Sequence, residues 1–313
     1  MTVSETRKLI LAAVGLGLAA LLPLTDNGYF LSLGVTIAMY NVLATSWALF
    51  SGPTHYISLA TAAFYGLGTY VVAAGIEYIP YPVLLVMSLV AGAVLAALVG
   101  LATLRLSGVY FVIFTLGLAE MIRQVVTWIQ NNMGGQRGLY VLTNITEEII
   151  YWELVAVAAL VYLAGWWIGR SRLGFALRII GNDEVVAAHC GIKTARIKVT
   201  LFVVSGMVAA LTGALLAPRW TYIEPNLAFS AMLSFQVVIM ALLGGVTRLW
   251  GPLVGVVPFS LLWEVISAKY PNQNMLLLGI AFLLIVFVIP HGIVGRLESL
   301  IHRVRPGMGN TQI

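Results

Sequence analysis

Two ionisable residues with the spacing of a helical ion pair lie inside a long apolar stretch. Glu120 and Arg123 are three residues apart, so on a helix their side chains share a face and can pair. A pair of opposite charges costs far less in a membrane than a lone charge, and such groups usually face the interior of a helix bundle. We expect either a structural pair or a role in gating or along a solute's route. Glu264 also lies in an apolar stretch, but near its end, where water reaches it.

Other chemistry-bearing patterns are missing from the sequence. The segment from Gly191 to Thr194 approaches a phosphate-binding loop, but it has an extra residue before Lys193 and no upstream glycine. The histidines have no metal-ligand spacing, and no Gly-x-Ser-x-Gly nucleophile motif occurs. The single cysteine, Cys190, excludes an internal disulfide. We therefore expect no catalytic residues, no metal site and no cofactor in this chain, and a membrane enzyme is disfavoured.

Composition assigns the chain to the membrane. Hydrophobic residues make up 60% and charged residues 9%, whereas a soluble domain carries about 25% charged residues. The basic pI near 9.4 does not indicate nucleic-acid binding, because the positive charges are dispersed among apolar segments. Since a helix needs about 20 apolar residues to cross the bilayer, the sequence predicts an all-α polytopic membrane protein with about ten spans and no separate soluble domain. The predicted spans are 9–25, 30–50, 56–76, 82–104, 109–129, 153–169, 199–219, 229–247, 251–268 and 275–292. The first is expected to be a retained helix rather than a signal peptide.

The positive charges orient this arrangement. With the N-terminus inside, 13 of the 17 Lys and Arg residues fall on the cytoplasmic side, as the positive-inside rule requires. These are Arg7, Lys8, Arg105, Arg170, Arg172, Arg178, Lys193, Arg196, Lys198, Arg248, Arg296, Arg303 and Arg305. An even number of spans places both termini in the cytoplasm. Two halves of five helices each predict an inverted repeat, although no internal sequence repeat is visible.

The longest inner segment, 170–198, is a polar island between two apolar stretches. It holds six of the 17 cations and two of the 12 acids. A polar segment held between two spans on the cytoplasmic side is expected to form a short helix there. Such a helix is accessible to a second protein.

Glycine clusters mark places where the helices are interrupted. Irregular backbone at membrane depth is tolerated only where protein or a watery cavity shields it. The clusters predict either ordinary turns or bends near a solute pathway, and the candidate positions are Gly134, Gly135, Gly138, Gly244 and Gly245. By contrast, Ser205, Ala209 and Gly213 recur every four residues, which favours close packing of one helix against another.

Several strings, in their order and spacing, resemble the M-type permease subunit of branched-chain (hydrophobic) amino acid ABC importers. The resemblance covers about residues 30 to 297. The matching strings are Ser107 to Phe111 with Thr115, Leu116, Ala119, Glu120 and Arg123; Gly134, Gly135, Gly138 and Leu139; Arg172 to Gly174, Ala176 to Arg178, Asn182 to Glu184, Ala187, Ala188, Gly191 and Ile192; Lys198 and Phe202 to Ala214; Leu243 to Gly245, Trp250 to Pro252 and Gly255; and Pro290 to Gly295.

The resemblance implies a multi-chain system in the bacterial inner membrane. This chain, a single permease domain over residues 1–313, would pair with a second, related permease, two cytoplasmic ATPases that bind ATP and Mg²⁺, and a periplasmic solute-binding protein. The loop at 170–198 would carry the coupling helix that contacts an ATPase, through Asn182, Asp183, Glu184, Ala187, Ala188 and Gly191. Glu184 and Lys193 would pair with ATPase side chains or be solvated.

One segment departs from the family pattern. The family commonly reads Gly-Tyr-x-Gly-x-x-Ser-Leu-Gly-His before the third span, whereas here Ser58 and Leu59 are kept but the Gly-His pair is Ala60 and Thr61. This departure leaves the solute open among branched-chain amino acids, urea, amides and small aromatic or carboxylic acids. An ion-coupled secondary transporter is the remaining rival class. It would need carboxylates at the bilayer midplane, for which Glu120 is the candidate.

Overall fold

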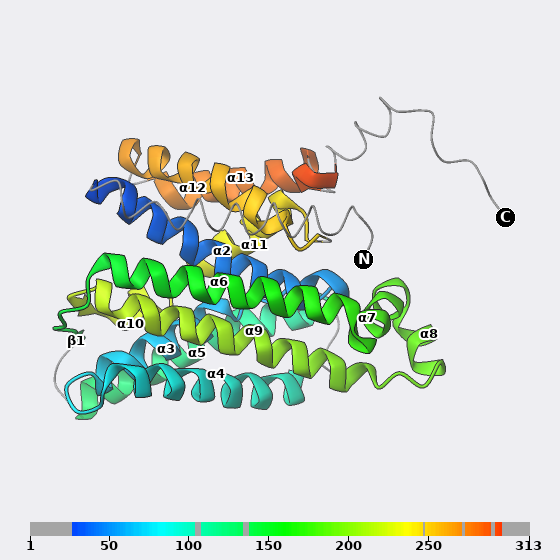
Figure 1. Cartoon of the computed structure of the whole chain (residues 1–313), viewed down its shortest axis with the longest axis horizontal. Coiled ribbons are helices and arrows are strands. Elements are labelled where there is room, and N and C mark those ends of the chain that lie inside the picture. Colours follow the sequence, from blue (N-terminus) through cyan, green and yellow to red (C-terminus); the bar gives the residue numbers. More distant parts are fainter. Residues whose placement is uncertain are drawn as a thin grey trace.

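The computed structural model describes residues 27–103, 108–133, 138–246, 248–270, 273–288 and 292–295, and these are mostly helical (Figure 1). The elements, in chain order, are α2 (Gly28–Thr54), α3 (Thr61–Gly75), α4 (Tyr81–Thr103), α5 (Val109–Met133), β1 (Leu139–Tyr140), α6 (Glu147–Arg170), α7 (Arg172–Asn182), α8 (Glu184–His189), α9 (Thr194–Leu216), the 3₁₀ turn η2 (Ala217–Arg219), β2 (Tyr222–Ile223), α10 (Pro225–Ala228), α11 (Ala231–Gly244), α12 (Gly251–Lys269) and α13 (Asn274–Val288).

Seven helical segments in the described residues are long and apolar enough to cross a membrane: α2, α4, α5, α6, α9 with η2, α10 with α11, and α12. Two further apolar helices, α3 and α13, have 15 residues each and are shorter than a full span. The predicted span at 9–25 lies outside the described residues. A multi-pass helical membrane protein is therefore confirmed. The described residues contain seven candidate spans, and the total of about ten stays a prediction.

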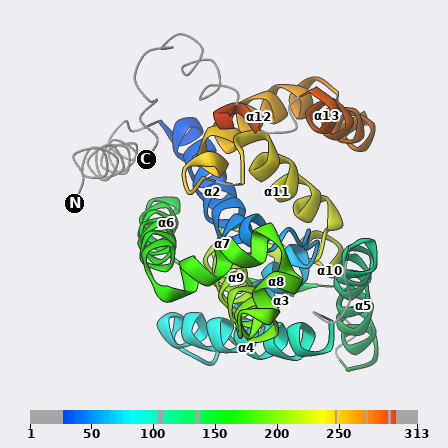
Figure 2. The ribbon, with the colours of Figure 1, turned by 90° about the vertical axis from the view of Figure 1, so that its right-hand side faces the viewer.

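The long helices run side by side along the long axis of the molecule (Figure 1). Viewed from the end, α2, α3 and α9 lie inside, with α4, α5, α6, α11 and α12 around them (Figure 2). The α9 helix packs against α3 and α4, and α2 packs against α6, α9, α11 and α12. Close approach depends on small residues: a Cβ at Gly68 would overlap the carbonyl oxygen of Ala210, and one at Gly213 would overlap that of Tyr65. The sequence pattern at Ala209 and Gly213 thus forms a helix-packing face.

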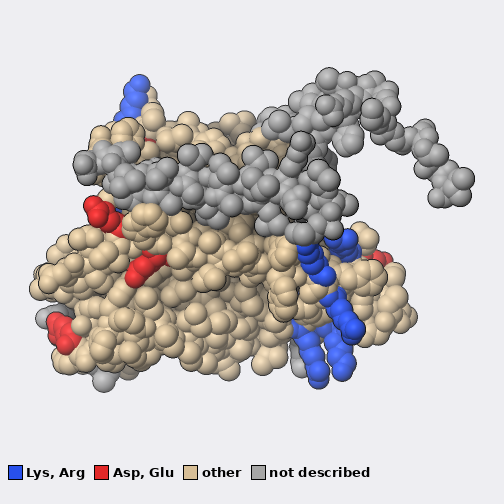
Figure 3. Space-filling model, viewed as in Figure 1, with Lys and Arg blue, Asp and Glu red and all other residues tan. Residues whose placement is uncertain are grey.

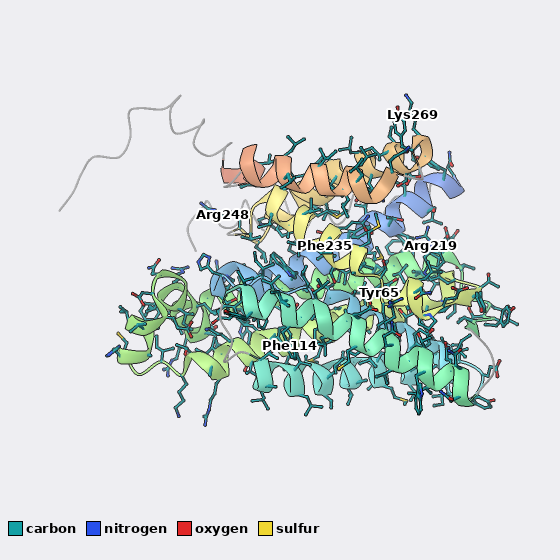
Figure 4. The ribbon with its side chains drawn as sticks, turned by 180° about the vertical axis from the view of Figure 1, so that it is seen from behind. Tyr65, Phe114, Arg219, Phe235, Arg248 and Lys269 are labelled. Atoms are coloured by element: carbon teal, nitrogen blue, oxygen red, sulfur yellow. The ribbon has the colours of Figure 1, made fainter. Side chains whose placement is uncertain are left out.

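Charged side chains gather at the two ends of the bundle (Figure 3). The end formed by α7, α8 and the start of α9, here called the cationic end, carries Arg170, Arg172, Arg178, Lys193 and Arg196. The opposite end, here called the acidic end, carries Glu77, Glu147, Glu148, Glu153 and Glu224, together with the two-stranded antiparallel ribbon of β1 and β2. Figure 4 shows Arg219 and Lys269 at the acidic end and Arg248 toward the other.

A run of irregular backbone, residues 55–60, separates α2 from α3. The predicted span at 56–76 began too early, because the helix starts only at Thr61. His55 terminates α2 with φ of 58°, and it is the one non-glycine residue with positive φ in the described part of the chain. Apolar composition alone does not reveal this break, since Ile57, Leu59 and Ala60 continue the hydrophobic stretch.

The second half of the irregular run, residues 58–60, is buried inside the bundle. Trp47 Nε1 donates a hydrogen bond of 2.7 Å to the carbonyl oxygen of Ser58, and the Leu59 N–H donates to Thr115 Oγ1 at 3.0 Å. Trp47 and Thr115 lie about 10 Å from the ends of α2 and α5 at the cationic end, by the helical rise per residue. Backbone groups at this depth must find partners within the protein. Side chains of α2 and α5 therefore supply the hydrogen-bond partners that the backbone of a continuous helix would have provided for residues 58 and 59.

Candidate functional site

A pair of short helices, α7 and α8, forms the polar island at the cationic end (Figure 1). Asp183 separates them and caps α8: its Oδ1 accepts hydrogen bonds from the N–H groups of Val185 at 2.7 Å and Val186 at 3.2 Å. The carboxylate therefore pairs with backbone donors left free at a helix start. Gly191, with φ of +78°, follows the helix and turns the chain toward α9. The expected short helix between two spans is present.

The two faces of α8 differ sharply. Ala187 is fully buried against the bundle, whereas Ala188 and the apolar side chains of Val185 and Val186 are exposed, the valines by 64% and 51%. On α7, Phe175 is also exposed, by 68%. Neither short helix is a candidate span, so these side chains form an apolar surface at the cationic end. This combination fits a surface that a second protein covers.

Glu184 pairs with a residue of this chain, whereas an ATPase side chain or solvent was expected. Its carboxylate forms an ion pair with Lys198 Nζ on the first turns of α9. Lys198 is only 1% exposed, and its Nζ also donates to Tyr56 Oη at 3.1 Å and lies 4.2 Å from the centre of the Tyr56 ring. Glu184 is thus paired within this chain, although its side chain stays 44% exposed. Its contact with an ATPase stays a prediction. Lys193 is exposed at the surface.

The Glu120–Arg123 pair lies near the middle of α5. Arg123 Nε donates to Glu120 Oε2 at 2.9 Å, and a second guanidinium nitrogen contacts Oε1. The side chains are 54% and 28% exposed, so the pair faces outward from this chain rather than into its own bundle as expected. Since charges at mid-span avoid lipid, this face of α5 needs either another protein or water against it.

The same face extends beyond the ion pair. Gln124 Nε2 donates to Glu120 Oε1 at 3.0 Å, and Arg123 also donates to Asn226 Oδ1, which ties α5 to α10. Of the seven candidate spans, α5 is the least buried. Figure 4 looks onto this side, with Phe114 of α5 and Phe235 of α11 labelled, and both rings are partly exposed. The polar groups and aromatic rings make this the candidate pathway face.

The glycine clusters separate into turns and packing contacts. Gly244 and Gly245 end α11 in a tight turn, where a Cβ at Gly244 would overlap the carbonyl oxygen of Gly251. Gly245 has φ of 109°, and Gly292 packs directly on it. Gly138 is buried against the ring of Tyr222 beside the β1–β2 ribbon. The geometry at these three glycines is that of close backbone packing; Gly134 and Gly135 lie outside the described residues.

Sequence reasoning missed the residues that hold the irregular run and the buried lysine. Ser58, Thr115 and Ser234 come from three distant segments, and Lys198 was counted among the cytoplasmic cations. One signal pointed to the run: Ser58 and Leu59 are the two residues there that keep the family pattern. No local spacing links Glu184 to Lys198, which lie 14 residues apart across a turn.

Comparison with known proteins identifies the family of the chain. The model of the family described as branched-chain amino acid transport system / permease component matches residues 29–289. The high-affinity branched-chain amino acid transport system permease protein LivM of Escherichia coli is 25% identical over 325 residues, covering 92% of this chain and 75% of the relative. LivM of Salmonella typhimurium is 26% identical, covering 82% and 67%. The LivH permease protein of Escherichia coli is 29% identical, covering 49% of each chain.

A solved structure shares the fold. PsaBC from Streptococcus pneumoniae in complex with Fab aligns with a TM-score of 0.51 at 16% identity, covering 88% of this chain and 97% of that chain. At this identity the likeness concerns the fold alone. The family match, by contrast, spans most of the chain, from α2 to the end of α13. The chain therefore belongs to the family of permease components of branched-chain amino acid transport systems.

Proposed function

We propose that this chain forms one half of the transmembrane pathway of an ATP-driven importer for branched-chain or other hydrophobic amino acids. The other half is a second, related permease. Two cytoplasmic ATPases bind ATP and Mg²⁺ and hydrolyse the nucleotide, while a periplasmic binding protein delivers the solute. This chain performs no covalent chemistry. Its own contribution is conformational, since ligands on either side shift a two-state equilibrium of the helices.

The observation that carries the proposal is the pair of faces on α8. A short helix held between two spans is buried through Ala187 and presents Val185 and Val186 outward. A coupling helix that binds an ATPase needs both attachment to the bundle and an apolar contact surface, and α8 has both. The remaining candidate contacts, Asn182, Ala188 and Gly191, are exposed around α8, and Asp183 holds its first turn.

The pathway itself is proposed to run along the outward face of α5. Glu120, Arg123 and Gln124 lie on this face at mid-span, next to Asn226 of α10. Covering the face with the second permease removes the charges from lipid and leaves a polar strip between the two subunits. An amino acid carries one positive and one negative group, both of which have counterparts in this strip.

The arrangement in the membrane follows from the charges. We place the cationic end in the cytoplasm and the acidic end in the periplasm of a bacterial inner membrane. Ten spans in two inverted five-helix halves, with both termini in the cytoplasm, complete the proposed topology. The acidic end, with the β1–β2 ribbon and α10, is then the side that meets the binding protein.

Reconstitution tests the function. The chain is co-expressed with its second permease and ATPases, and the purified complex is placed in liposomes with the binding protein outside. We expect ATP inside the liposomes to drive uptake of radiolabelled leucine, and an ATPase variant lacking the catalytic carboxylate to abolish it. Uptake that proceeds without an ATPase, driven by a sodium or proton gradient, would overturn the proposal in favour of a secondary transporter.

The solute is tested in the same liposomes. Unlabelled isoleucine and valine are expected to compete with leucine, whereas urea, acetamide and benzoate are not. Competition by one of these three, together with failure of the branched-chain amino acids, would keep the importer but reassign its solute.

A further inference from the structure

Lys198 is the most unusual charged residue in the described part of the chain, because it is almost fully buried at the start of a span. Lysine is rarely buried to this degree unless it is paired, and here its 1% exposure is matched by two partners. The partners come from different elements: Glu184 from α8 and Tyr56 from the irregular run before α3. One ammonium group therefore joins α8, α9 and the irregular run.

The irregular run continues this connection to α5. The Tyr56 ring meets Phe111 edge-on, with ring centroids 5.3 Å apart and planes at 80°. Four residues further along α5, Thr115 Oγ1 accepts the Leu59 N–H. Both contacts are on α5, the helix that carries the Glu120–Arg123 pair a further turn along. The Tyr56 contact is anchored in a buried cluster of Phe50, Phe111 and Phe202.

We propose that Lys198 is a positioning residue that transmits a displacement of α8 to the pathway face of α5, through Tyr56 and the irregular run. The inference rests on the proposed function, since it presumes that an ATPase moves α8. Lys198 binds neither nucleotide nor solute. Its role is to fix the distance between α8 and the run at residues 55–60, so that neither moves alone.

The Lys198 contacts resist movement, whereas the run at residues 55–60 permits it. A charge-assisted contact from a desolvated ammonium is strong and directional, so it holds α8 against the bundle. The run at 55–60 is not tied by a helical hydrogen-bond ladder, and backbone of this kind absorbs the φ and ψ changes of a hinge. Because Lys198 connects α8 to this hinge, a displacement of α8 shifts α3 relative to α5.

Lys198→Met is the informative variant. Methionine has similar length and is apolar, so it fills the buried site without leaving an unpaired charge, and Glu184 is exposed enough to be hydrated. Glu184→Gln is less suitable because it leaves a buried ammonium without its carboxylate. Arg196→Met is the matched control: it removes one cation from the same segment, but from an exposed position. Lys198→Arg restores the charge as the conservative variant.

The readout is the number of leucine molecules taken up per ATP hydrolysed by the reconstituted complex. We expect Lys198→Met to lower this ratio by about tenfold or more, within the range of coupling between two sites, while the complex assembles and hydrolyses ATP. Arg196→Met should keep the wild-type ratio and Lys198→Arg should recover part of it. A purely structural role for Lys198 would reduce assembly and hydrolysis together with uptake. A wild-type ratio in Lys198→Met, or an equal loss in assembly, hydrolysis and uptake, overturns the inference.

A second measurement does not depend on transport. Cys190 is the sole cysteine in the chain and is exposed directly after α8, so a nitroxide on it reports movement of α8. In a Cys190→Ser background, Val125→Cys places a nitroxide on the exposed face of α5. We expect ATP to change both signals in the otherwise native complex. In Lys198→Met only the Cys190 signal should change, and an unaltered ATP response at Val125→Cys would refute transmission through Lys198.

The two proposals fail in different ways. If the native complex shows no ATP-driven uptake of any solute, the proposed function fails, and the inference that rests on it fails too. If the native complex transports and Lys198→Met does so with the same ratio, the importer stands and only the role of Lys198 is lost.

Discussion

The hydroxyl group of Ser234 on α11 bridges the backbone around Leu59, where α3 has not yet begun. It donates to the carbonyl oxygen of Leu59 at 2.8 Å and accepts from the Ala62 N–H at 2.9 Å. Ser234 is itself fully buried. One side chain thus satisfies a donor and an acceptor that a continuous helix through residues 55–60 would have paired internally. The break in the helix is held open by chemistry from a segment 175 residues away.

Ser234→Ala should destabilise the protein because it leaves two buried backbone groups without partners. Each such group is worth about 1–3 kcal/mol, so the midpoint of thermal unfolding of the detergent-solubilised complex should fall by several degrees. Ser205→Ala, on the partly exposed side of α9, is the control and should leave the midpoint unchanged. Equal midpoints for the two variants would mean that another group replaces the Ser234 hydroxyl.

Glu120→Ala should reduce uptake sharply while expression stays normal. Removing the carboxylate leaves the Arg123 guanidinium unpaired at mid-span and deprives the pathway face of its negative group. We expect a loss of about tenfold or more in initial uptake rate, which corresponds to about 1.4 kcal/mol. Uptake of radiolabelled leucine by the reconstituted complex measures it.

Glu264→Ala provides the matched comparison for this loss. Glu264 is also an acid in a candidate span, but it is exposed on α12 toward the acidic end. Its removal should leave uptake near the native rate. Native uptake in Glu120→Ala would confine the ion pair to a packing role.

Gly244→Ala should prevent the tight crossing of α11 and α12. A methyl group there meets the backbone of Gly251 and Gly255, which has no rotamer with which to move aside. Overpacking of this kind costs about 1–3 kcal/mol or more, so we expect poor assembly, measured as the yield of monodisperse complex after size-exclusion chromatography. Gly279→Ala adds the same methyl group where nothing lies within 4 Å and should assemble normally. Equal yields would show that the two helices separate without penalty.

Arg219→Met should loosen the acidic end. Its guanidinium donates to Glu147 Oε1 at 3.2 Å and to Ser32 Oγ at 2.6 Å, which joins η2 to α6 and α2. The group is largely buried, so we expect a loss of about 1–2 kcal/mol, between the values for exposed and buried pairs. Thermal unfolding measures it, with Lys269→Met, an exposed cation at the same end, expected to be neutral. A similar small shift in both variants would rule out a stabilising role for the Arg219 contacts.

The sequence allowed the helices and the two charged ends to be predicted, because hydropathy and the positive-inside rule depend on local composition. Nine of the ten predicted segments coincide with helices in the described residues, although α3 and α13 are shorter than spans. Spacing also predicted which two side chains pair at Glu120 and Arg123. These features need no knowledge of what lies across the fold.

Features that depend on distant partners were not predictable. Glu184 was expected to be solvated or to contact another protein, because nothing local identifies Lys198 as its partner. The start of α3 was placed too early because Ser234 and Thr115, which stabilise the irregular run, are far away in sequence. The predicted direction of Glu120 was wrong for a related reason. Burial of the Glu120–Arg123 pair needs a surface that this chain does not supply.

The outward ion pair on α5 has a consequence for how the protein is made. A newly inserted subunit without its partner presents Glu120, Arg123 and Gln124 toward the acyl chains, where ionised groups are poorly accommodated. We therefore expect the solitary subunit to be short-lived and open to membrane proteases until a second subunit covers α5. Cellular amounts of this chain should accordingly follow the amount of its partner, and synthesis of the two from neighbouring genes would keep the orphaned form scarce.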